Sequence, residues 1–143
     1  AKIFVANCAR CHGKDGEGLM QDKGETYLYP PLWGSKAYQP GSSMHRIIKL
    51  APWLMANMPY GIATHEKPFL SSEEAFDVAA FINDDSIHAR PPVKEFQYPN
   101  IEEKAIDYDR GPFADSFSEE RHKYGPYQPI IDYWKSKEMR VSY

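Results

Sequence analysis

The sequence contains two cysteines, Cys8 and Cys11, and His12 directly follows the second of them. A Cys-x-x-Cys-His pattern is the attachment signature of c-type haem. On one helical turn the two sulfurs reach the two vinyl groups of a porphyrin, and the next residue places its imidazole under the iron. We therefore predict one covalently bound haem c per chain, attached at Cys8 and Cys11, with His12 as an iron ligand.

Three other interpretations of the cysteine pair are a disulfide, a redox-active dithiol and half of a zinc site. A structural zinc site normally has four ligands, and the sequence offers no second cysteine pair. A thioredoxin-like dithiol normally follows a strand of a βαβ unit, and no such pattern precedes Cys8. The sequence therefore favours haem attachment.

A haem electron carrier normally has a second axial ligand on the iron. Met58 directly precedes Pro59, which prevents a helix from continuing, so its thioether stands at the start of a stiff loop. Met44 and Met55 fall on helical faces with apolar neighbours, where methionine more often fills a core. We predict His12 and Met58 as the two iron ligands. The alternatives are an open sixth site and the side chains of Met20, Met44, His45, Met55, His65 and His88.

A ligating histidine usually donates its other ring N–H to a carbonyl or a carboxylate. The proline-rich segment 29–34 supplies rigid backbone, and we expect the carbonyl of Pro30 to accept this hydrogen bond from His12. A plain proline turn is the alternative. Trp33 in the same segment is a candidate for contact with the haem, and a role in an aromatic core is equally consistent with its position.

Sequence patterns typical of helices predict that residues 1–87 form one compact helical domain. We expect a helix over about 43–50 and a second short helix from Pro52, because proline suits a first helical turn better than a helix interior. Ser71 and Glu74 have the spacing of a capping box and begin a helix that ends by Asn83, with an apolar stripe facing Phe4. No stretch shows the sustained alternation of a sheet. We predict an all-α domain with the organisation of a class I cytochrome c.

Residues 88–143 are rich in proline and aromatic side chains. Such a composition does not suit a free tail, so we predict a long irregular extension that lies on the haem domain or on a partner, anchored by its aromatic rings. A short final helix is expected over 128–138. A partly disordered C-terminus is the alternative.

Charge and hydropathy exclude some classes of partner. The formal net charge of −3 argues against a nucleic-acid partner, because such affinity rests on basic contacts to phosphate. No apolar run approaches the roughly 20 residues that span a bilayer. Thioether attachment of haem takes place outside the cytoplasm, so we expect an exported, periplasmic protein whose export signal has been removed.

The chain resembles bacterial class I cytochromes c, and more narrowly the second, C-terminal haem domain of dihaem thiosulfate dehydrogenases. The stretches that carry the resemblance are residues 8–12, 29–34, 41–46, 56–59, 77–83, 111–115 and 122–126. The resemblance implies sulfur-compound electron transfer, in which the family's enzymes oxidise thiosulfate to tetrathionate. In two respects the chain departs from the family: it has no cysteine after Cys11 to serve as the distal ligand of a catalytic haem, and Asn57 replaces the lysine that in some members exchanges with the methionine ligand.

Three functions are compatible with these features. The first is an electron-transfer module that passes single electrons to a redox partner protein or to a second haem domain, alone or in a homo- or hetero-oligomer. The second is a haem domain or subunit of an enzyme acting on thiosulfate or a related anion, which leaves open whether the chain is itself an enzyme. The third is a ligand-sensing or structural haem protein. The basic side chains that could line an anion site are Lys23, Lys36, His45 and Arg46.

Overall fold

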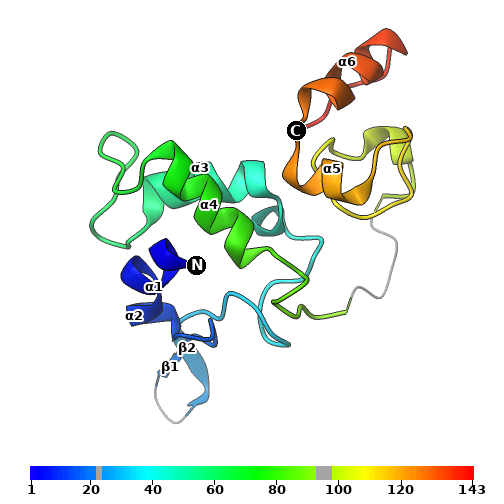
Figure 1. Cartoon of the computed structure of the whole chain (residues 1–143). Helices are drawn as coiled ribbons and strands as arrows, with labels where there is room; N and C mark the ends of the chain where they lie inside the picture. Colours follow the sequence, from blue (N-terminus) through cyan, green and yellow to red (C-terminus); the bar gives the residue numbers. More distant parts are fainter. Residues whose placement is uncertain (22–23, 93–97) are drawn as a thin grey trace. The chain divides into compact units, whose positions relative to one another are not determined.

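The computed structural model describes residues 1–21, 24–92 and 98–143. The chain forms two compact units, Ala1–Val93 and Lys94–Tyr143 (Figure 1). No helix in the described residues is both long enough and apolar enough to cross a membrane. The predicted boundary after residue 87 and the predicted packing of the extension on another surface stay predictions.

The first unit is mainly helical. Its elements are α1 (Lys2–Asn7), α2 (Ala9–His12), β1 (Leu19–Gln21), β2 (Thr26–Tyr29), the 3-10 turn η2 (Ser43–His45), α3 (Ile47–Asn57) and α4 (Ser72–Ile82). Helices α3 and α4 lie side by side (Figure 1), and their apolar faces form the core together with Phe4 of α1. Phe4 packs on Phe81 with ring centroids 5.4 Å apart, as the sequence predicted.

The expected break at Pro52 is wrong, because α3 runs continuously from Ile47 to Asn57 with Pro52 inside it. An interior proline removes one helical hydrogen bond and costs about 3 kcal/mol. The helix nevertheless buries four apolar side chains at helical spacing, and this burial offsets the local cost. These side chains are Ile47, Leu50, Ala51 and Leu54. The residues before α3, Ser43–His45, form only a 3-10 turn rather than the predicted helix.

Helix α4 begins as predicted. The Ser71 hydroxyl accepts from the Glu74 amide at 3.2 Å, and the Glu74 carboxylate accepts from the Ser71 amide at 2.9 Å. This reciprocal capping box satisfies two amides that would otherwise lack helical partners. Asn83 caps the C-terminal end.

A small sheet is present where the sequence predicted none. Strands β1 and β2 pair antiparallel, with Leu19 opposite Tyr29 and Gln21 opposite Thr26. Both strands are very short and almost wholly exposed. Because neither face is buried, no alternation of apolar and polar residues marks them in the sequence.

An aromatic cluster joins the start of the chain to the residues after α4. The Trp33 ring stacks on the His88 ring at 3.8 Å, and it also packs on Phe4 and Phe81 at 5.1 and 5.9 Å between centroids. His88 is only 7% exposed, and its burial lowers the pKa of its imidazole below the ordinary value of 6.5.

The second unit falls in the stretch that the sequence predicted as an irregular extension, and it has a core of its own. Its elements are the 3-10 turn η3 (Ile101–Glu103), α5 (Glu119–Tyr124) and α6 (Gln128–Ser136). Helix α6 corresponds to the expected final helix, whereas α5 was not predicted. Ile106, Ile130 and Trp134 form a buried apolar cluster.

A buried polar network holds this second core together. The side chains of His122 and Asp115 are fully buried, and His122 Nε2 lies 3.1 Å from Asp115 Oδ1. The Asp115 carboxylate also accepts from Trp134 Nε1, and the carbonyl of Ile106 lies 2.6 Å from His122 Nδ1. One carboxylate thus lies against two buried rings, that of His122 and that of Trp134, and accepts the indole N–H of Trp134.

Replacing Asp115 should therefore destabilise the second unit. In Asp115→Asn an amide group replaces the carboxylate that both rings contact, and we expect the unfolding free energy of the second unit to fall by about 3 kcal/mol, typical of a broken buried pair. Amide hydrogen exchange of peptides from residues 98–143 measures this loss. Asp132→Asn is the control: Asp132 is exposed on α6, and the expected change is within about 0.5 kcal/mol. Equal exchange in the two variants would contradict the role of the network.

The lowered pKa of His88 predicts a pH dependence of stability. The unfolded chain binds a proton on this side chain at about pH 6.5, whereas the folded chain resists it, so stability is complete above that pH and falls as the pH drops below it. The variant His88→Phe keeps an aromatic ring beside Trp33. Its unfolding free energy should fall less between about pH 7 and about pH 5 than that of the wild-type protein. The same change at exposed His65 should leave the loss unaltered, as measured by guanidinium unfolding.

Candidate haem site

The Cys-x-x-Cys-His segment forms one helical turn. Cys8 lies between α1 and α2, and its carbonyl accepts from the amides of Cys11 and His12 at 3.1 and 2.9 Å. Residues three and four positions apart on a helix project from the same side. The two thiols and the imidazole therefore face one side, as attachment to a single porphyrin requires.

The cysteines do not have the character of a redox-active pair. Neither forms a disulfide, and both are half-buried. Burial, with a smaller contribution from neighbouring Cys11, raises the pKa of the Cys8 thiol to about 11. Redox dithiols have lowered thiol pKa values, so this environment fits a thioether attachment point better than a catalytic dithiol.

His12 has the partner that the sequence predicted. Its Nδ1 lies 2.8 Å from the carbonyl oxygen of Pro30, and because a carbonyl only accepts, Nδ1 carries the proton. This tautomer leaves Nε2 as the nitrogen able to bind a metal ion. The donor set thus fits a c-type haem, while the assignment of His12 and Pro30 as binding residues stays a prediction.

A glycine loop holds His12 and the proline segment together. The Gly18 amide donates to the His12 carbonyl, and the Leu32 amide donates to the Gly16 carbonyl, both at 2.8 Å. Gly18 has a φ of +76°, and a Cβ at this position would lie 2.5 Å from the carbonyl oxygen of Tyr29. Only glycine allows this approach of loop backbone to the segment that carries Pro30.

Met58 occupies the position expected of a ligand at the start of a loop. It follows α3 with an extended backbone, φ −127° and ψ 137°, and its amide still donates to the Leu54 carbonyl. Its side chain packs on the same apolar core as Cys8, and so do Met44 and Met55. Met58 therefore stays a prediction as the second iron ligand.

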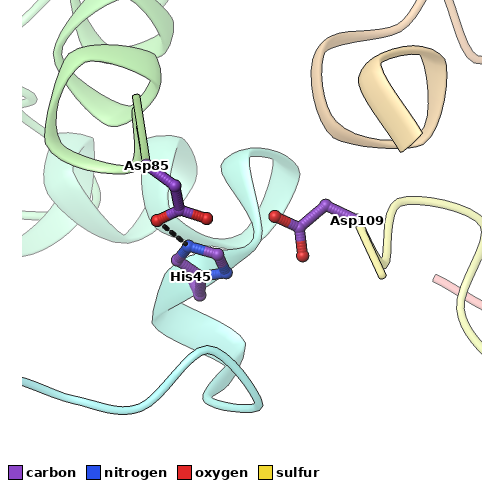
Figure 2. Close-up of side chains that lie close together, drawn as sticks. All are labelled: His45, Asp85 and Asp109. Carbon is purple, nitrogen blue, oxygen red and sulfur yellow. Dashed lines mark hydrogen bonds and ion pairs between the residues drawn. The ribbon is translucent and has the colours of Figure 1, made fainter. Parts of the chain in front are cut away.

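Two of the histidines considered as alternative iron ligands contact other side chains of the first unit. His45 is 2% exposed, and its Nε2 lies 3.1 Å from Asp85 Oδ1 (Figure 2). His88 is stacked on Trp33. These contacts argue against both as iron ligands, and His65 and Met20 are exposed.

Other predicted site residues have mixed outcomes. The observed contacts of Trp33 are those of the aromatic core, and its predicted contact with haem stays a prediction. Of the basic side chains considered for an anion site, Lys23 lies outside the described residues and Lys36 is exposed. His45, a third candidate for this site, is buried with its ring against Asp85, and its place in an anion site stays a hypothesis.

Sequence reasoning missed a buried polar cluster at the end of α4. Asn83 is fully buried, and its side chain donates to the Met44 carbonyl at 2.9 Å and accepts from Tyr38 Oη at 2.8 Å. Arg90 donates to the same Asn83 side chain at 2.7 Å. No periodicity marks these residues, and Arg90 falls in the stretch assigned to the extension.

The packing of the glycine loop predicts unequal costs for two glycine substitutions. Gly18→Ala adds left-handed strain of about 1–2 kcal/mol and a steric clash of about 1–3 kcal/mol with the backbone of the proline segment. Gly24, with φ +83°, has open space around it, so Gly24→Ala should cost the strain alone. Denaturant unfolding measures the loss of unfolding free energy in each variant. Equal losses in the two variants would show that the loop does not pack on the proline segment.

The chain is similar to proteins of a known family. The family model described as cytochrome c matches residues 1–86. The thiosulfate dehydrogenase of Stutzerimonas stutzeri (strain A1501) is 36% identical over 107 residues, covering 75% of this chain and 32% of that protein. That of Allochromatium vinosum is 39% identical over 93 residues, covering 65% of this chain and 32% of that protein. The chain spans about a third of the length of these relatives.

The chain is also similar to a solved structure. The thiosulfate dehydrogenase (TsdBA) from Marichromatium purpuratum, in its "as isolated" form, is 38% identical with a TM-score of 0.56, covering 78% of this chain and 22% of that chain. Because the family model covers more than half of the sequence, and includes the haem-attachment motif, the chain belongs to the cytochrome c family and its cofactor is covalently bound haem c.

Proposed function

We propose that this chain is a single-electron carrier in thiosulfate metabolism, with haem c attached at Cys8 and Cys11 and the iron held by His12 and Met58. The haem supplies the one-electron chemistry. The hydrogen bond from His12 to the Pro30 carbonyl is the observation that carries the proposal, because it fixes the imidazole tautomer and orientation that an axial ligand needs.

The protein's own residues would tune this electron transfer. A thioether ligand supplied by Met58 would raise the reduction potential of the haem relative to a second histidine ligand. The apolar core that contacts Cys8 and Met58 would limit water near the iron. Two protein ligands would leave no open position on the iron for a substrate, which favours electron transfer over chemistry at this metal.

The partner we propose is a second haem domain or a separate redox protein. The relatives support this choice. They are named thiosulfate dehydrogenases, and each is about three times as long as the stretch that it shares with this chain. We further propose that the chain corresponds to the second, C-terminal haem domain of such proteins and works in the periplasm, where haem c is attached.

Replacing Met58 tests the iron ligation. In Met58→Ala the sulfur-to-iron charge-transfer band near the red edge of the ferric absorption spectrum should disappear, because its sulfur donor is gone. Met55→Ala is the matched control, since Met55 lies on α3 and packs on the same core without being the proposed ligand. Survival of the band in Met58→Ala, or its loss in Met55→Ala, would refute the assignment.

The second candidate function is a haem domain or subunit that itself acts on thiosulfate, which the names of the relatives favour. Carbon monoxide separates the two functions. A carrier with two protein ligands should not bind carbon monoxide in its reduced form at neutral pH, and thiosulfate alone should not reduce it. Rapid binding together with thiosulfate-dependent reduction would favour the enzyme.

A further inference from the structure

The Arg90 guanidinium connects two parts of the first unit that are distant in sequence. Its side chain is 3% exposed. Nη1 donates to the Leu32 carbonyl at 2.5 Å, and Nη2 donates to the Ile82 carbonyl at 2.6 Å and to the Asn83 side chain at 2.7 Å. One planar group thus ties the proline segment 29–34 to the end of α4.

A second contact strengthens this connection. The Gly34 amide donates to the carbonyl of Ala89, the residue before Arg90, at 2.7 Å. The stretch Ala89–Arg90 therefore holds the proline segment at both Leu32 and Gly34. Leu32 lies two residues after Pro30, whose carbonyl accepts from His12.

We propose that Arg90 is a positioning residue for the haem iron: it holds the proline segment so that the Pro30 carbonyl stays on His12 Nδ1, and thereby lowers the reduction potential. This inference rests on the proposed function, in which His12 binds the iron. A hydrogen bond accepted from Nδ1–H makes the imidazole a stronger donor and stabilises ferric iron. When the proline segment is released, this stabilisation weakens and the potential rises.

Arginine suits this role for a geometric reason. Its planar fork presents several fixed N–H donors, which reach the Leu32 and Ile82 carbonyls at the same time. The guanidinium lies over the Tyr38 ring at 4.3 Å, and its Nε is 3.8 Å from the Asp85 carboxylate. Lysine would keep the positive charge but could not reproduce the fork.

Arg90→Lys in the haem-loaded protein tests the proposal by potentiometric titration. Because lysine keeps the positive charge, we expect the reduction potential to rise only through the loss of positioning. The ratio of ferrous to ferric protein at a fixed solution potential should increase by up to about tenfold, which corresponds to about 59 mV for one electron. The charge-transfer band of the methionine ligand should remain. If Arg90 acted only through its charge, Arg90→Lys would leave the reduction potential unchanged. Arg90→Gln, which removes a cation, would then lower the reduction potential.

Tyr38→Phe separates positioning from general destabilisation. It removes the hydrogen bond to Asn83 within the same polar cluster, but it leaves the aromatic ring and the contact of Arg90 with Leu32. We expect a lower melting temperature and an unchanged potential. If Arg90→Lys lowers the melting temperature without raising the potential, Arg90 is only structural. If the wild-type protein itself lacks the methionine band, the proposed function fails instead.

Discussion

The hydrogen bond between His12 and Pro30 is the constraint on which the candidate haem site depends. It joins a helical turn to a proline segment 18 residues further along the chain. The glycine loop and the short β1–β2 hairpin bring these two segments together, and Gly18 allows the backbones to approach. An imidazole on a flexible turn could rotate, whereas one whose Nδ1 is held by a carbonyl presents Nε2 in one direction.

The buried polar cluster connects the proline segment to the end of α4 through hydrogen bonds. Asn83 and Arg90 lie at the end of α4 and bond to carbonyls of two other segments, those of Met44 and Leu32. Buried polar groups are costly unless they are paired, so such a cluster tolerates few alternative arrangements. The arrangement couples α4, which packs on α3, to the backbone that holds His12.

The sequence predicted those features that depend only on residues close together in the chain. The haem motif, the capping box at Ser71 and the end of α3 at Met58 each depend on residues within one or two helical turns. The continuity of α3 through Pro52 could not be predicted, because burial along the whole helix outweighs the local cost of proline. The same limit applies to Arg90, whose role depends on contacts up to 58 residues away in the chain.

Peptide mapping of the mature protein by mass spectrometry tests the central claim most directly. We predict that the peptide containing residues 8–12 carries the added mass of one haem, with no free thiol at Cys8 or Cys11. Unmodified cysteines in a protein purified from cells competent for haem attachment would contradict the proposed site, whatever the fold of the chain.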